Sequence, residues 1–200
     1  MINRRRLLLL APAGVLAAGL VGAAGWMTLH REEGPVPIGG PFRLRAADGR
    51  EVTDADFRGR WMLVYFGYTR CPDACPTALQ DMANALDTLS PDAKGKVAVL
   101  FITIDPERDT PAVMQDYVTA FNAPITGLSG TPEQIAAVAK EYRVYYAKHP
   151  KGGGEYDMDH SSIIYVMDPR GRFVANFTHE TAPDDIAAKL RGLMGGTSIG

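Results

Sequence analysis

The chain has 200 residues, of which 46% are hydrophobic, with 21 basic and 23 acidic side chains. This length and apolar content are sufficient for one globular domain and one additional segment. The first 30 residues hold three of the basic side chains and none of the acidic ones, so the remainder is more acidic than the whole chain. An acidic surface repels phosphate, which excludes nucleic acid as an expected partner.

The N-terminus predicts a membrane anchor. Three arginines at residues 4–6 precede an uncharged stretch, residues 7–29, which is about long enough to cross a bilayer as one helix. The positive-inside rule then predicts a single-pass protein of the bacterial inner membrane with its domain in the periplasm. A cleaved signal peptide is the alternative, because glycines and alanines follow the apolar core, and the paired arginines leave twin-arginine export open. We therefore assign residues 1–30 to an anchor or signal and residues 31–40 to a linker.

Residues 41–193 predict a mixed α/β domain with an added N-terminal hairpin. Short apolar runs predict strands, and apolar residues at helical spacing after a capping residue predict helices. In chain order, the expected strands are residues 42–44, 51–53, 61–66, 97–104, 125–128, 142–147, 162–167 and 173–177. The expected helices are residues 77–89, 110–121, 131–139 and 183–193, with a mobile glycine-rich loop at 151–154 and a flexible tail at 194–200. This alternation implies a mixed sheet with helices on its faces.

The two cysteines of the chain, Cys71 and Cys75, lie between the strand at residues 61–66 and the helix at residues 77–89. A disulfide that closes so short a loop contributes little stability, so chemistry explains the pair better than structure does. The helix N-terminus beside Cys75 favours its thiolate, which is the nucleophilic and metal-binding form. We therefore predict redox or metal chemistry, and a dithiol on this strand–helix turn is typical of a thioredoxin-like fold.

Two thiolates prefer Cu(I) or zinc, and histidine is the residue available to complete the site. Among the four histidines, His160 directly precedes the strand at residues 162–167. In a thioredoxin-like fold the turn that enters this strand faces the dithiol. A thioredoxin has a cis-proline at this turn, whereas this chain has His160 and Ser161 there and no proline. Cys71, Cys75 and His160 then form a three-ligand site, which fits Cu(I) better than closed zinc. The alternative is a histidine satisfied by local hydrogen bonds.

Three further features carry weaker signals. Met158 is a soft candidate auxiliary ligand, although a side chain that packs or faces solvent is the favoured interpretation. Asp73 lies between the cysteines, where it could orient a ligand, meet a partner or simply form the turn. The charged segment at residues 105–110 predicts either a partner surface or a helix-capping loop.

Four motifs stand out together, namely GYTRCPDACP at residues 67–76, TIDPERDTP at 103–111, DHSS at 159–162 and DPRG at 168–171. In combination they resemble the Sco/SenC family over residues 41–193. The resemblance implies a membrane-tethered, thioredoxin-fold copper chaperone that helps to assemble the dinuclear copper centre of cytochrome c oxidase. It also implies that Cys71, Cys75 and His160 hold the copper, as Cu(I) or also as Cu(II).

The resemblance also implies the partners. These are the copper-bearing subunit of the oxidase, other copper chaperones or thiol reductases, and the membrane. A turnover enzyme is not expected. The main alternative is a thiol-disulfide reductase in which Cys71 and Cys75 form a redox-active disulfide. A peroxidase is a weaker alternative, because Thr69 and Arg70 are near but the second thiol lies very close to the first.

Overall fold

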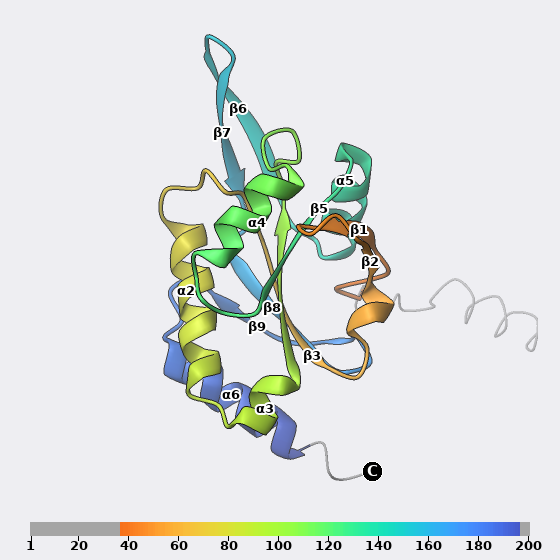
Figure 1. The fold of residues 1–200 in the computed structure, drawn as a ribbon, viewed down its shortest axis with the longest axis vertical. Helices are drawn as coiled ribbons and strands as arrows, with labels where there is room; N and C mark the ends of the chain where they lie inside the picture. Colours follow the sequence, from red (N-terminus) through yellow and green to blue (C-terminus); the bar gives the residue numbers. More distant parts are fainter. Residues whose placement is uncertain (1–36, 197–200) are drawn as a thin grey trace, which may run out of the picture. The chain divides into compact units, whose positions relative to one another are not determined.

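A seven-stranded mixed sheet is the centre of the computed structural model, which describes residues 37–196 (Figure 1). Its strand order is β2–β1–β5–β4–β3–β8–β9. The strands are β1 (Arg43–Ala46), β2 (Glu51–Thr53), β3 (Trp61–Gly67), β4 (Val97–Thr103), β5 (Ile125–Ser129), β8 (Ile163–Met167) and β9 (Phe173–Thr178). β3, β4 and β5 are parallel, whereas β8 joins β3 and β1 joins β5 in the antiparallel sense. The thioredoxin-like mixed sheet is therefore confirmed, together with the added hairpin β1–β2.

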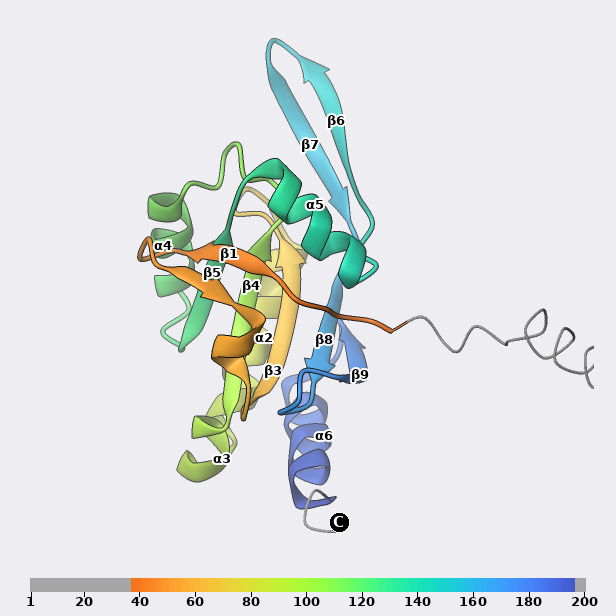
Figure 2. The ribbon, with the colours of Figure 1, turned by 90° about the vertical axis from the view of Figure 1, so that its right-hand side faces the viewer.

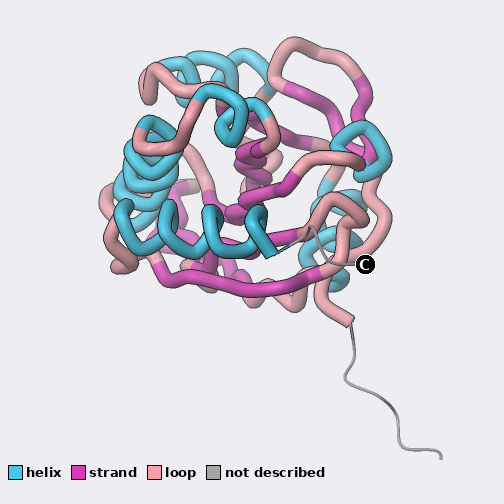
Figure 3. Tube along the Cα trace, turned by 90° about the horizontal axis from the view of Figure 1, so that it is seen from below, coloured by secondary structure: helices cyan, strands magenta, loops and turns pink. Residues whose placement is uncertain are grey.

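The central strands β3 and β4 are buried along their whole length. Their continuous apolar sequences fit this position, because a parallel strand covered on both faces needs no polar face. Helices α2 (Ala74–Asp87) and α6 (Pro183–Gly196) pack against each other, and α5 (Pro132–Glu141) lies on the opposite side of the sheet from α2 (Figure 2). Seen from below, the helices are distributed around the strands (Figure 3).

The helical elements are η1 (Asp54–Phe57), α2 (Ala74–Asp87), α3 (Pro91–Gly95), α4 (Pro111–Thr119), α5 (Pro132–Glu141) and α6 (Pro183–Gly196). Three of them share one start signal: Ser90, Thr110 and Thr131 each accept a hydrogen bond from a backbone N–H of the first turn, and a proline follows each. A side-chain oxygen satisfies a free N–H there, and proline lacks an N–H that would need a partner. The sequence signals for these helices are therefore explained by capping.

The strand expected at residues 142–147 is wrong in its bounds, because only residues 146 and 147 of that range are in a strand, whereas the loop expected at 151–154 is found in part, as a turn at residues 153–154. The chain instead forms a separate two-stranded hairpin of β6 (Tyr146–Gly152) and β7 (Glu155–His160), which extends away from the main sheet (Figure 1). Glycines 152–154 all have positive φ and make its turn. The hairpin is largely exposed, so its strands lack the apolar alternation by which a strand is recognised.

The predicted anchor at residues 1–30 and most of the linker lie outside the described residues, as do residues 197–200 of the tail. Between residues 37 and 196, none of the helices has the length and apolar character required to span a bilayer.

Candidate metal centre

The two cysteines occupy different environments at the end of β3. Cys71 lies in the loop before α2 and is half-buried, whereas Cys75 is the second residue of that helix and is fully buried. The helix begins at Ala74, three residues earlier than expected, so Cys75 lies within its first turn. The backbone N–H of Cys75 donates to Cys71 Sγ at 3.5 Å, while Asp73, in the N-cap position, makes no capping bond through its side chain. The sulfur of Cys71 thus takes the place of a capping oxygen.

This geometry makes the two thiols unequal. Hydrogen bonding with Cys75 lowers the pKa of Cys71 to about 3, against the opposing effect of burial, and His160 contributes in the same direction. The hydrogen bond with Cys71 raises the pKa of Cys75, and burial raises it further. The prediction that the helix N-terminus favours the thiolate of Cys75 is therefore wrong. The side chains of Cys75 and His160 both favour the charged form of the other sulfur, so Cys71 is the favoured thiolate.

His160 is the last residue of β7, and its imidazole ring faces the dithiol. Its Nε2 lies 3.5 Å from Cys75 Sγ. Its Nδ1 lies 3.2 Å from the carbonyl oxygen of Ser161, so an Nδ1–H that donates there leaves Nε2 free for a metal. The rings of Tyr65 and Tyr68 meet the imidazole edge-on at centroid distances of 6.0 and 5.9 Å. These contacts hold the ring in one orientation.

Cys71, Cys75 and His160 offer three ligand atoms that all lie within 4.8 Å of one another. In the described part of the chain, this is the one group of three or more His, Cys, Asp or Glu side chains arranged in this way. Two sulfurs and one imidazole nitrogen suit Cu(I), whereas a structural zinc site is normally closed by a fourth protein ligand. The donor set is thus suited to copper.

The other candidates take no place in this group. Met158 is 7% exposed and packs in the hydrophobic core, where it lines a small cavity of about 120 Å³ with Ile104 and Tyr146. Asp73 is exposed. The burial of Met158 supports packing, and not solvent exposure, as its role.

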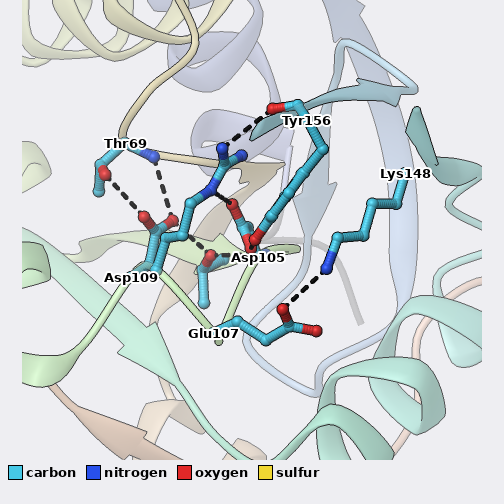
Figure 4. Close-up of polar contacts among 8 residues, drawn as sticks. Thr69, Asp105, Glu107, Asp109, Lys148 and Tyr156 are labelled. Atoms are coloured by element: carbon cyan, nitrogen blue, oxygen red, sulfur yellow. Dashed lines mark hydrogen bonds and ion pairs between the residues drawn. The ribbon is translucent and has the colours of Figure 1, made fainter. Parts of the chain in front are cut away.

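Asp109 holds the loop that carries Cys71, a role that sequence reasoning missed. Its buried carboxylate accepts hydrogen bonds from the backbone N–H and the hydroxyl of Thr69, at 3.0 and 2.6 Å, and from the hydroxyl of Thr103 at 2.6 Å (Figure 4). Burial raises the pKa of this carboxyl group although the three hydrogen bonds oppose the shift. The next residue, Thr110, caps α4, so the helix-capping interpretation of this segment is confirmed. The only sequence signal was an acidic residue shortly after a buried strand.

A second set of contacts fixes the hairpin β6–β7 to the same loop (Figure 4). Arg108 forms an ion pair with Asp105 and donates to the backbone carbonyl of Tyr156 at 3.0 Å, with its guanidinium 3.6 Å above the Tyr156 ring. The Tyr156 hydroxyl donates to Asp105 at 2.7 Å, and Lys148 pairs with Glu107 at 2.7 Å. The strand that ends at His160 is thereby held against the loop that supports the dithiol.

The comparisons with known proteins agree with this geometry. The family model described as SCO1/SenC matches residues 30–195. The human protein SCO1 homolog, mitochondrial, is 42% identical over 167 residues, which are 80% of this chain and 54% of that protein. Protein SCO1 homolog 1, mitochondrial, of Arabidopsis thaliana is 40% identical over 162 residues, 79% of this chain and 48% of that protein. The chain thus spans about half the length of these curated relatives.

Two solved structures with copper bound share the fold. ScoI of Bradyrhizobium japonicum has 46% sequence identity and a TM-score of 0.73, over 78% of this chain and 98% of that chain. Yeast Sco1 has 36% identity and a TM-score of 0.73, over 82% of this chain and 91% of that chain.

Proposed function

The chain belongs to the SCO1/SenC family, and from this premise we propose that it is a copper chaperone for the assembly of the dinuclear copper centre of cytochrome c oxidase. It binds one copper ion through Cys71, Cys75 and His160 and passes it on as cargo. The observation that carries the proposal is the convergence of the three ligand atoms within 4.8 Å. The copper bound in relatives of the same fold supports it.

The two thiols have different tasks in this proposal. Cys71 is already the favoured thiolate, and copper must displace the proton from Cys75 when it binds. Because Cys71 is half-buried and Cys75 is fully buried, an incoming ligand from a partner approaches the copper from the Cys71 side. His160 supplies Nε2 as the third ligand while its other nitrogen is held at the Ser161 carbonyl.

The test is the copper content of the full chain, purified in detergent and reduced before loading. We expect about one copper per chain for the wild type and loss of tightly held copper for His160→Ala. His149→Ala is the matched control, since His149 lies on the same hairpin but is exposed and paired with Asp159 at 2.8 Å. Copper content and affinity of His160→Ala equal to those of the control would refute the assignment.

The second candidate function is a thiol-disulfide reductase. A half-buried thiolate beside a buried thiol is the arrangement of an attacking and a resolving cysteine. Cys71 would attack a partner disulfide to form a mixed disulfide, and Cys75 would then displace the partner as a dithiol while Cys71 and Cys75 become a disulfide. A Cys75→Ser chain would accumulate the mixed disulfide. A trapped partner, together with a dispensable His160, would favour this function over the copper chaperone.

The placement of the protein in the cell is part of the proposal. The uncharged stretch at residues 7–29, preceded by arginines, supports a single-pass anchor with the domain at residues 41–193 in the periplasm. The proposed partners there are the copper-bearing subunit of the oxidase, other copper chaperones and thiol reductases. The test of this orientation is digestion by an added protease. The domain should be cleaved in spheroplasts and protected in intact cells.

A further inference from the structure

The hydroxyl group of Tyr65 is buried beside the dithiol and has no hydrogen-bond partner within the described structure. Tyr65 lies in the middle of β3 and is 0% exposed. Buried hydroxyl groups nearly always have a partner, because burial without one removes their hydrogen bonds to water. An unsatisfied donor at this position therefore indicates a partner that is present in another state of the protein.

The side chains of Ser162 and Cys75 both lie near this hydroxyl, and of the two only the sulfur of Cys75 changes its charge in the proposed function. A Cβ atom added to Gly67 would lie 2.5 Å from Cys75 Sγ and 3.2 Å from Tyr65 Cε1, so the sulfur and the phenol ring border the same small space. The Tyr65 ring also contacts His160, whose Nε2 faces the same sulfur. Burial raises the pKa of Tyr65, so its hydroxyl keeps its proton and is available as a donor.

We propose that Tyr65 Oη donates a hydrogen bond to the sulfur of Cys75 when that sulfur is a thiolate, and that Tyr65 is thus a positioning residue for the buried ligand. The inference deepens the proposed function and rests on it, because copper requires Cys75 in the thiolate form. A neutral thiol is a weak acceptor, whereas a thiolate is charged and forms stronger hydrogen bonds. The thiolate of Cys75 has particular need of a donor, because it is fully buried and lies beside the negative charge of Cys71.

Tyr117 provides a matched control. Its hydroxyl also lacks a partner, and its pKa is raised first by burial and then by the charges of Cys75 and Cys71. However, Tyr117 lies on α4, and its ring packs on Phe101 and Phe121 rather than on His160. Tyr117→Phe therefore removes the same atom from the same neighbourhood without removing a donor to the sulfur.

The first experiment compares the full-length wild type, Tyr65→Phe and Tyr117→Phe after loading with copper. In competition with a Cu(I) chelator, Tyr65→Phe should bind copper about tenfold more weakly, as expected for the loss of one hydrogen bond to a charged group. In the Cu(II) form its sulfur-to-copper charge-transfer band should move to lower energy, because the lost donor no longer stabilises the sulfur electrons. Tyr117→Phe should match the wild type. Equal affinity and equal band position in the two variants would overturn the proposal.

The second experiment needs no copper. In a Cys71→Ser chain, the ultraviolet absorbance of the Cys75 thiolate is followed with pH, with and without Tyr65→Phe. The additional substitution should raise the midpoint by about one pH unit, which is the same tenfold effect; an unchanged midpoint would overturn the proposal. If the wild type holds no copper, the proposed function fails, and this second measurement still decides the role of Tyr65.

Discussion

Gly67 and Cys75 approach so closely that no side chain fits between them: a Cβ atom on Gly67 would lie 2.5 Å from Cys75 Sγ and 2.9 Å from Phe101 Cε2. The strand β3 ends at this glycine, and the buried sulfur packs directly over its backbone. The position of one proposed copper ligand therefore depends on the absence of a side chain at the end of the central strand.

Gly67→Ala should displace the sulfur of Cys75. We expect a loss of about 1–3 kcal/mol in the free energy of unfolding, since overpacking forces neighbours out of place, together with weaker copper retention. Urea unfolding and copper content of the purified chain measure the two effects. Gly192→Ala is the control, because a Cβ there meets nothing within 4 Å and the helix α6 should gain about 0.5–1 kcal/mol. A Gly67→Ala chain as stable as the wild type would contradict the packing described.

Asp109→Ala should loosen the loop that carries Cys71. Three donors, two of them on Thr69, lose their acceptor, and we expect destabilisation by about 1–3 kcal/mol with faster loss of bound copper. Thermal or urea unfolding and the rate of copper transfer to a chelator are the measurements. Asp116→Ala, which changes an exposed residue of α4, should leave both unchanged. Wild-type copper release from Asp109→Ala would show that the loop does not need this support.

Cys71 should stay reactive in acid. Because hydrogen bonding with Cys75 lowers its pKa to about 3, its thiolate persists until the pH falls to that value. In the reduced, metal-free chain, the alkylation rate of Cys71 should therefore be nearly constant from about pH 5 to pH 8. An ordinary thiol would lose about tenfold in rate per pH unit below its pKa of about 8.5.

Cys75→Ala removes the group that contributes most to this shift, so it should restore the pH dependence of Cys71 alkylation. Mass spectrometry of the alkylated chain identifies the modified residue at each pH. A rate that rises tenfold per unit between pH 6 and pH 8 in the wild type would show that Cys71 is an ordinary thiol.

Asp168→Asn should reduce stability at neutral pH more than in acid. The carboxylate accepts from the backbone N–H groups of Arg170 and Arg172 and from the Arg172 side chain. Burial acts to raise the pKa of Asp168, but the hydrogen bonds outweigh it and hold the pKa below the ordinary value of an aspartate. The ionised group thus stabilises the folded state above that value, and the contribution disappears as the pH falls through the lower, folded-state pKa.

We therefore expect a difference of about 1 kcal/mol between the wild type and Asp168→Asn at pH 7 and a smaller difference near pH 3. Unfolding by urea at both pH values measures it. Asp92→Asn, which removes an exposed ion pair with Lys96, should show little difference at either pH. A difference in unfolding free energy between the wild type and Asp168→Asn that is larger at pH 3 than at pH 7 would contradict this prediction.

Much of the sheet could be predicted because its local signals agree with its tertiary position. Residues 61–66 and 97–104 are continuously apolar, and they form the strands that are buried on both faces. The helices after Thr110 and Thr131 were recognisable from their caps. The hairpin β6–β7 was not, since its exposed strands need no apolar pattern and it is held instead by Arg108 and Tyr156, contacts to a loop far away in sequence.

The sequence alone determined the chemistry available to this protein: two sulfurs on one strand–helix turn, a histidine before a later strand, and the motifs of the Sco/SenC family. Tertiary structure decided which sulfur is the thiolate, because that depends on the burial of each sulfur and on its contacts with the other sulfur and with His160. It also placed His160, 85 residues from Cys75 in the chain, within 3.5 Å of its sulfur. The sequence gives the type of residue at each position. The distances between segments far apart in the chain are set only when the sheet brings its strands together and side chains such as Asp109 hold the loops in place.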